Sequence, residues 1–383
     1  MDAAAMGVAS SDVLLFLLAI AVFTIAATAT WSRRGRGHGN GAPSMFSAPR
    51  LAARAADRHA EVAALVESLL HGGAAAGAAV TLRPRLFELV LNVMLCAVTG
   101  DRARRADVRR FQEIVEETFA VSGAPSVGDF FPALRWVDRL RGVDAALLRL
   151  HARRDAFVGG LVNDQRRRRD GGNILLTAGT DTPALTTEWA MALLLTNPEA
   201  MQKVRAELDA NVGTARLVEE SDMTNLPYLQ CVVKETLRLC PVAPVIPAHE
   251  AMEDCTVGGF AVRRGTMILV NAWAIHRDPK LWDAPEEFRP ERFLHADTVG
   301  AVTVQMLPFG LGRRRCPGEG LAMRLVSLTL AALVQCFEWG VGEGRSGVDM
   351  DEGVGLTMPM ATPLSAVRRT RKFVRSMLSA STR

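Results

Sequence analysis

The chain has 383 residues, of which 49% are hydrophobic and 22% charged. This composition excludes a wholly disordered protein and provides enough residues for one large domain or two ordinary ones. The 45 Lys and Arg residues against 41 Asp and Glu residues leave a net charge of +4, too small to indicate a nucleic-acid partner. The six cysteines include no Cys-x-x-Cys pair, which argues against a disulfide scaffold and a zinc ribbon.

The first predicted element is a membrane anchor. Residues 13–30 carry no charge, and as a helix they span about 27 Å, close to the hydrocarbon thickness of a bilayer. Arg33 and Arg34 follow, so the basic side is expected to stay in the cytosol. A cleaved signal peptide is the alternative, but such peptides normally begin with Lys or Arg. We predict an anchor over residues 1–34 and a Gly-rich linker over residues 35–44.

The remaining residues, 45–383, are predicted to form one domain that is mainly α with a small β region. Hydrophobic periodicity and Pro or Gly stops predict helices over residues 48–70, 82–98, 107–121, 143–169, 173–196, 198–212, 224–239 and 318–337. Between the last two, residues 241–275 contain β-rich segments on either side of a Gly258-Gly259 turn. This stretch is the predicted strand region.

The most informative stretch is the loop FGLGRRRCPG, residues 309–318. Cys316 follows three arginines and precedes the last long helix, and nearby cations and a helix N-terminus both stabilise a thiolate. The glycines of the loop would let backbone amides approach the sulfur closely. By themselves these residues leave two possibilities open: an anionic sulfur ligand, or a reactive or buried cysteine in a tight turn.

The same loop resembles the haem-binding signature of cytochromes P-450, Phe-x-x-Gly-x-Arg-x-Cys-x-Gly. The five fixed positions are met by Phe309, Gly312, Arg314, Cys316 and Gly318. The resemblance implies the cytochrome P-450 fold over roughly residues 44–383. It also implies that Cys316 is the axial thiolate ligand of the iron in haem b. Phe309 would pack near the sulfur, and Arg314 would pair with a haem propionate.

A second motif of the resemblance joins two segments. Glu235 and Arg238 in KETLRL are neighbours on one helical face and by themselves are an ordinary surface pair. The resemblance implies that they form a buried triad with Arg292 of PERF, because a planar guanidinium suits a bidentate carboxylate. In this interpretation the triad is structural and needed for haem retention, and it is not catalytic.

A third motif, AGTDT, occupies residues 178–182 inside an apolar helix, where polar residues cost stability unless something uses them. By itself it is equally a polar face toward water. The resemblance implies that Gly179 makes room for O2, Thr182 donates a hydrogen bond to O2 at the haem, and Asp181 helps to relay protons. His249 is expected to contact a propionate, as in plant members of the family. His276 is typical of the family, but we assign it no chemistry.

The implied activity is that of a haem-thiolate monooxygenase acting on a small lipophilic substrate with O2. Electrons would come from NADPH through a cytochrome reductase, because the chain has no dinucleotide fingerprint of its own. The stretches around AGTDT and the cysteine loop resemble plant isoflavone-hydroxylase-like and herbicide-metabolising enzymes, which implies phenylpropanoid-like or xenobiotic substrates. The expected location is the endoplasmic reticulum membrane, with one span in contact with membrane lipid and the catalytic domain in the cytosol.

Two segments expected of the family have no counterpart. Between Arg36 and Ser44 the chain passes directly from the anchor to a mid-domain helix, without the hinge, main sheet and first helices. Only seven or eight residues separate Arg169 from the AGTDT motif, where a further helix is expected. A truncated, non-catalytic product of a cytochrome P-450 gene is therefore the alternative. A haem-thiolate isomerase or dehydratase is a third possibility, against which the retained Asp181 and Thr182 argue.

Overall fold

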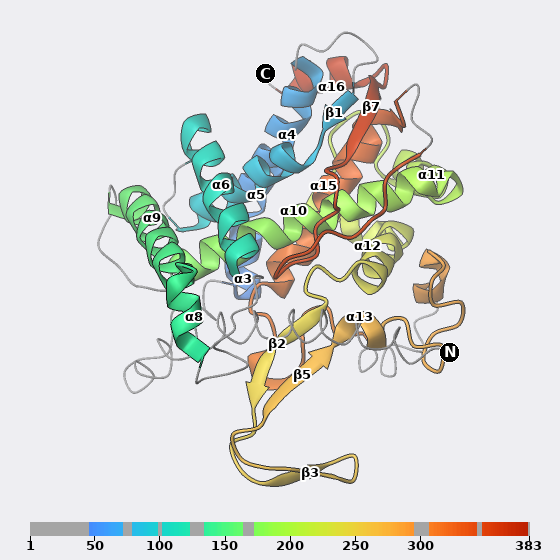
Figure 1. Cartoon of the computed structure of the whole chain (residues 1–383). Coiled ribbons are helices and arrows are strands. Elements are labelled where there is room, and N and C mark those ends of the chain that lie inside the picture. Colours follow the sequence, from blue (N-terminus) through green and yellow to red (C-terminus); the bar gives the residue numbers. More distant parts are fainter. Residues whose placement is uncertain are drawn as a thin grey trace.

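The computed structural model describes residues 46–71, 79–98, 102–122, 134–163, 172–294, 306–342 and 347–381. These residues are mostly helical and carry three small antiparallel sheets (Figure 1), so the predicted mainly α fold is confirmed. The predicted anchor and linker lie outside the described residues, as does the basic end of the helix predicted over residues 143–169.

The helices follow the predicted segments closely. Pro198 and Pro227 occupy the first turns of α11 and α12, where a fixed φ favours helix initiation and the missing N–H leaves no bond unmade. The described α-helices are α3 (Ala48–Ala53), α4 (Ala55–His71), α5 (Arg83–Val98), α6 (Arg105–Ser122), α8 (Arg135–Leu140), α9 (Val143–Asn163), α10 (Gly172–Thr196), α11 (Pro198–Asn211), α12 (Pro227–Leu239), α13 (Ala272–Ile275), α15 (Glu319–Cys336) and α16 (Val374–Ser381).

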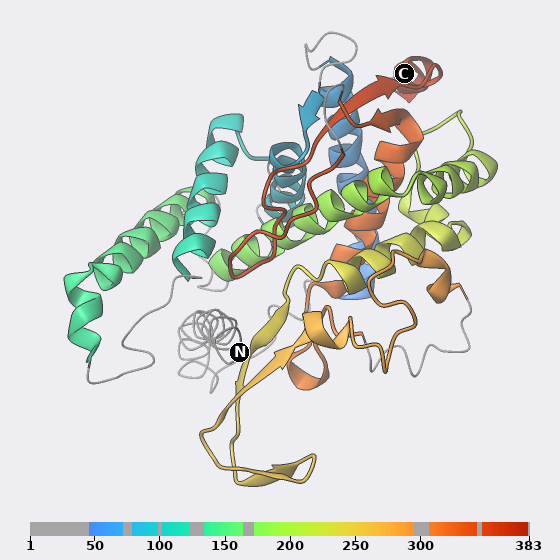
Figure 2. The same cartoon turned by 45° about the vertical axis from the view of Figure 1, so that its right-hand side comes forward.

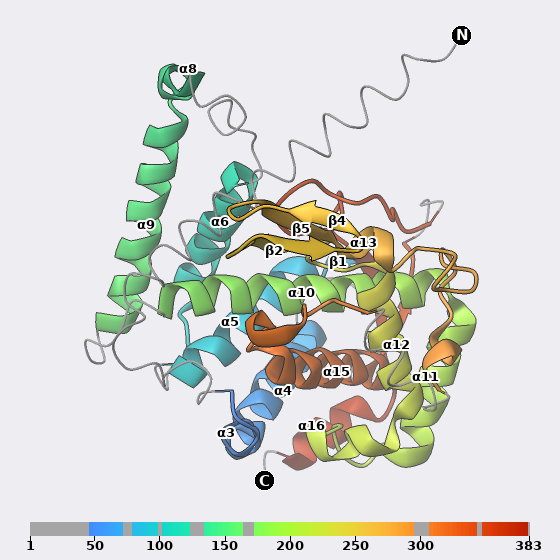
Figure 3. The same cartoon turned by 90° about the horizontal axis from the view of Figure 1, so that it is seen from below.

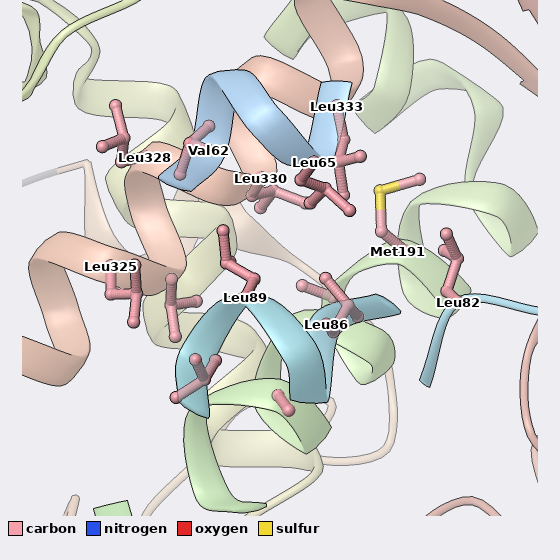
Figure 4. Packing of buried hydrophobic residues seen from close by; sticks show 14 of the residues in the cluster. Val62, Leu65, Leu82, Leu86, Leu89, Met191, Leu325, Leu328, Leu330 and Leu333 are labelled. Atoms are coloured by element: carbon pink, nitrogen blue, oxygen red, sulfur yellow. The ribbon is translucent and has the colours of Figure 1, made fainter. Parts of the chain in front are cut away.

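Four helices, α4, α5, α10 and α15, pack together in the hydrophobic core (Figure 4). Their facing side chains are mainly leucines with almost no exposed surface, and burying each such side chain stabilises the fold by about 1.5–3 kcal/mol. Within the described residues, α15 is the one helix long and apolar enough to cross a membrane. Because 72% of α15 is buried inside the structure, its apolar composition is explained by its place in the core.

The predicted strand region forms two antiparallel pairs. Strand β2 (Val245–Glu250) pairs with β5 (Met267–Asn271), and β3 (Cys255–Val257) pairs with β4 (Phe260–Val262). Gly258 and Gly259 form the turn between β3 and β4 with φ of +57° and +86°, a conformation that side-chain-bearing residues rarely adopt. The β3–β4 hairpin projects from the body of the molecule at the bottom of Figure 1.

The third sheet was not predicted. It contains β1 (Ala79–Thr81), β7 (Ser365–Thr370) and β6 (Phe337–Gly340) in the order β1-β7-β6. Its strands are far apart in the sequence, so their pairing is a long-range feature. On the other side of α10, strands β2 and β5 and the short helix α13 lie together below it in Figure 2. That side of α10 carries the candidate site.

Candidate active site

The cysteine loop is closed by its own backbone. The N–H of Cys316 donates to the C=O of Phe309 over 2.9 Å, and residues 312–314 form one turn of 3₁₀-helix, η5 (Gly312–Arg314). Gly310 and Gly312 have φ of +68° and +72°, which explains the requirement for glycine at both positions. The loop leads directly into α15, which runs beside α10 (Figure 3).

The side chain of Cys316 is exposed at the N-terminus of α15. Desolvation by the surrounding chain raises the pKa of the thiol above its usual value, although the backbone amides of Gly318 and Glu319 donate toward the sulfur and act in the opposite direction. Arg315 and the amides of the helix N-terminus act in the predicted direction, but in the protein alone burial outweighs them. Arg315 is paired with Glu319 at 2.6 Å, and the Glu319 charge itself raises the pKa of Cys316.

The residues around Cys316 fit a haem. Within the described chain no group of three or more His, Cys, Asp and Glu side chains is placed to hold a metal ion. A single sulfur ligand suits iron that arrives with four porphyrin nitrogens, and a bound metal deprotonates a coordinating thiol outright. The two amide donors from Gly318 and Glu319 would then face a thiolate, which is the charged acceptor they bind best.

The middle of α10 is open on one side. Ala178 is exposed, and Gly179 and Thr182 are half-buried, although most of the helix from Thr180 onward is buried. The hydroxyl of Thr182 donates to the C=O of Ala178 over 2.8 Å, a local bond that loosens the helix there. Pro183 follows and has no N–H for the C=O of Gly179. The AGTDT motif therefore lies in a continuous helix that lacks one backbone hydrogen bond at this point.

Glycine at position 179 also lets the side chain of Met94 pack closely against α10. A Cβ at Gly179 would lie 2.6 Å from the side-chain Cε of Met94 in α5, which is closer than such contacts are in proteins. The helix thus approaches α5 on one side while remaining open on the other. A larger residue at this position would displace the end of the Met94 side chain or α10 itself.

Asp181 points to the buried side of α10, away from Thr182. The hydroxyl of Thr357 donates to its Oδ2 over 3.0 Å, and burial raises the pKa of the carboxyl from 3.8 to about 7. Asp181 and Thr182 make no hydrogen bond with each other, as expected for adjacent helical residues. Asp181 is nevertheless suited to exchanging a proton near neutral pH, because its two protonation states have similar populations there.

The structure brings Glu235, Arg238 and Arg292 together. Arg238 donates to both carboxylate oxygens of Glu235 over 2.8 Å, and Arg292 donates to Oε1 over 3.0 Å. Neither Glu235 nor Arg238 has any exposed side-chain surface. The N–H of Arg289 donates a further bond to Glu235 over 2.9 Å, so the buried carboxylate receives four hydrogen bonds.

Arg238 also fixes the chain beyond α13. It donates to the backbone C=O groups of His276, Pro285 and Glu287 over 2.8, 2.7 and 3.1 Å. Its guanidinium lies 5.2 Å from the ring centroid of Trp282. All of its donors are directed at protein acceptors, which accounts for the burial of a full charge at this place.

The remaining predicted residues are spread around the loop. Phe309 is half-buried against the hydrophobic core. Arg314 in η5 and His249 in β2 are both exposed, and neither side chain makes a hydrogen bond or an ion pair within the described part of the chain. Neither side chain is therefore committed to a described partner, and each is available to pair with a carboxylate such as a propionate. Strand β2 and the loop are close, since a Cβ at Gly310 would lie 3.9 Å from Ile246.

The sequence did not point to the residues that hold the segment 357–364 against α10. Trp189 donates to the C=O of Met358 over 2.9 Å, and Glu188 accepts from Arg83 over 2.7 Å and from the N–H of Leu364 over 2.8 Å. The same segment carries Thr357, the partner of Asp181. A charged Glu-Trp pair inside an apolar helix was the one signal available, and it does not identify its partners.

Comparison with known proteins gives the same assignment. The family model for cytochrome P-450 matches residues 172–364. A cytochrome P-450 of Catharanthus roseus is 40% identical over 373 residues, covering 88% of this chain and 73% of that protein. An isoflavone 3'-hydroxylase of Medicago truncatula is 40% identical over 350 residues, covering 81% of this chain and 69% of that protein.

The fold agrees with this result. A zebra fish cytochrome P-450 solved with abiraterone superposes with a TM-score of 0.69 at 26% identity, covering 86% of this chain and 80% of that chain. Sequence, site and fold thus agree on a family whose members carry haem b and act as monooxygenases. The chain belongs to the cytochrome P-450 family.

Proposed function

We propose that this protein hydroxylates a small lipophilic substrate with O2, using electrons supplied by an NADPH–cytochrome reductase. The observation that carries the proposal is the exposed sulfur of Cys316, held on a closed loop at the N-terminus of α15 with two amides directed at it. When bound, haem supplies the chemistry that activates O2. The surrounding side chains would bind and orient the haem and supply protons.

The side chains of the loop and of β2 would hold and orient the haem. Cys316 would provide the sulfur ligand of the iron, Gly312 allows the turn of the loop with its positive φ, and the amide of Gly318 donates toward the sulfur. Arg314 and His249 have no protein partner within the described residues and would pair with the propionates. Phe309 packs on the core beside the loop and would shield the sulfur from water.

Thr182 and Asp181 would supply protons. The Thr182 hydroxyl lies on the open face of α10 and, by rotating away from the C=O of Ala178, can donate toward O2. Asp181 holds a proton on the buried face and can release it near neutral pH, because burial raises its pKa to about 7. Since the two side chains do not touch, the proton must pass between them through water or by a turn of Asp181 away from Thr357.

The substrate class we propose is aromatic, either phenylpropanoid-like or xenobiotic. It rests on the similarity to an enzyme named as an isoflavone 3'-hydroxylase. The proposed location is the endoplasmic reticulum membrane, with residues 1–34 as a single span and the catalytic domain facing the cytosol. The charge-free run of residues 13–30 and the arginines that follow it support this orientation.

The direct test is turnover by the full chain with haem, reductase, NADPH, isotope-labelled O2 and an isoflavone. We expect a product that contains one labelled oxygen atom. C316S should form none, whereas C255S, which changes an exposed cysteine on β3, should keep the wild-type rate. Product formation by C316S at the wild-type rate would overturn the assignment of the ligand.

The alternative is a truncated cytochrome P-450 product that does not turn over. The observation behind this alternative is that the alignment with the Catharanthus roseus relative covers 73% of that protein. Retention of haem by the purified full chain separates the two proposals. A chain that is folded but keeps no haem under saturating supply supports the non-catalytic alternative, and stoichiometric haem supports the enzyme.

A further inference from the structure

His276 lies directly after α13 and is completely buried. Both of its ring nitrogens are within hydrogen-bond distance of backbone groups. Nε2 lies 2.8 Å from the backbone nitrogen of Leu307, and Nδ1 lies 3.2 Å from the C=O of Arg238. The ring therefore connects the end of α12 to the segment that leads into the cysteine loop.

The two partners determine the state of the ring. A backbone N–H can only donate and a backbone C=O can only accept, so Nε2 must be an acceptor and Nδ1 must carry the proton. A doubly protonated ring would place two donors against each other at Leu307. Burial lowers the pKa of His276 to about 4, which agrees with a neutral ring under ordinary conditions.

Leu307 precedes Cys316 by nine residues in the sequence. Among the hydrogen bonds of residues 306–318 to described residues, the bond to His276 is the one that leaves the loop and the first turn of α15. The others stay inside the loop or reach that first turn. Within the described residues, the hydrogen bond between Leu307 and His276 is therefore the one polar contact that joins the loop to the rest of the domain beyond the start of α15.

The other side of His276 is rigidly held. Arg238 donates to the C=O of His276 over 2.8 Å while its own C=O accepts from Nδ1, so the two residues are bonded in both directions. Arg238 is in turn fixed by Glu235. The contact at Leu307 is therefore made from a part of the molecule that has little freedom to move.

We propose that His276 is a positioning residue for the haem-thiolate loop. The neutral ring, protonated at Nδ1, links Arg238, which is held by Glu235, to the backbone of Leu307. This link restricts the position of the loop and therefore the position of the Cys316 sulfur. The proposal rests on the proposed function in one respect, namely that Cys316 is the ligand of the iron. The role of His276 in holding Leu307 does not depend on it.

Two substitutions separate the two ring nitrogens. H276Q places a side-chain acceptor near the position of Nε2 and keeps a bond to Leu307, whereas H276N reaches only the position of Nδ1 and keeps a bond to Arg238. In the haem-loaded full chain we expect the Leu307 amide hydrogen to exchange slowly in wild type and in H276Q. In H276N it should exchange about tenfold faster, since one hydrogen bond is lost.

The second readout is the spectrum of the reduced carbonyl complex. H276Q should keep the wild-type share of the red-shifted Soret band that reports thiolate ligation, and H276N should convert a large share to the unshifted form. A purely volumetric role of His276 would give the same result for both variants. Equal spectra, or an equally protected Leu307 amide in H276N and wild type, would overturn the proposal.

The outcome stays decisive if the variants do not fold. Rapid exchange of the Leu307 amide in the wild-type holoprotein alone would contradict the proposal, because the amide would then have no stable acceptor. A protected Leu307 in a wild-type chain without any red-shifted band would instead contradict the function proposed for Cys316, and it would leave the contact with His276 intact.

Discussion

The polar groups of the site fall into two halves that differ in burial and in their partners. One half, which we call the buried ion network, consists of Glu235, Arg238, Arg292 and His276, and its polar atoms find partners within the protein. The other, the haem face, consists of Cys316, Arg314, His249 and Thr182, where partners are local or absent among the described residues. The first set of polar groups therefore stabilises the fold, whereas the second set is available to bind the cofactor.

This difference predicts the largest effect for the buried ion network. E235Q would leave two guanidinium groups facing a neutral amide, and breaking a buried pair in this way costs about 3–5 kcal/mol. Urea unfolding of the haem-loaded chain measures it. E117Q is the control, because the ion pair of Glu117 with Arg153 is about half exposed and should contribute no more than about 1 kcal/mol. Equal losses in the two variants would contradict the division into two halves.

On the haem face, removal of a charge should weaken haem binding and have little effect on the free energy of unfolding. R314A is expected to weaken haem retention by about 1–3 kcal/mol, the value of a charge-assisted hydrogen bond. The free energy of unfolding without haem should change by less than about 0.5 kcal/mol, because Arg314 is exposed and has no protein partner within the described residues. R313A, one residue earlier, is the control and should leave the rate of haem dissociation unchanged.

The raised pKa of Asp181 predicts that the free energy of unfolding depends on pH, and it determines the sign of that dependence. Between pH values of about 4 and 7 the unfolded chain loses this proton while the folded chain keeps it, so the carboxyl costs stability as the pH rises. D181N cannot ionise and can still accept a bond from Thr357. The stability of D181N relative to wild type should therefore rise by at most about 1.4 kcal/mol per pH unit over this interval. A difference that is flat with pH would show that Asp181 is ionised in the fold.

A small effect on stability is expected at Thr182. T182A removes a local bond to Ala178 and should cost less than about 1 kcal/mol. It should nonetheless lower the product formed per NADPH consumed, since the open face of α10 would lose its hydroxyl donor. T186A removes the same kind of bond one turn later, on the buried part of the helix, and should leave this ratio unchanged. Identical ratios in T182A and wild type would remove Thr182 from proton delivery.

Most of the helical scaffold follows from the sequence, because its signals are local. Apolar periodicity located α4, α5, α10 and α15, and Pro198 marked the start of α11. The third sheet was missed for the opposite reason. Strand β1 has three residues, and its partner β7 lies far along the chain, so nothing in either segment specifies the pairing.

The site divides in the same way. Glu235 and Arg238 are three residues apart, so the sequence alone predicts that they lie on one face of a helix. The structure places Arg292 beside them. The contacts of Thr357 with Asp181 and of Leu307 with His276 join segments that only the fold brings together. For Cys316 the sequence shows the arginines and the helix N-terminus that favour a thiolate, but neither the desolvation of the sulfur, which raises its pKa, nor the pairing of Arg315 with Glu319.

The most direct measurement is the absorption spectrum of the purified, reduced chain after addition of carbon monoxide. Coordination of haem iron by the Cys316 sulfur predicts the red-shifted Soret band in wild type and in C255S, and its complete loss in C316S. A wild-type chain that binds haem without this band, or a C316S chain that keeps it, would contradict the assignment of Cys316 as the ligand.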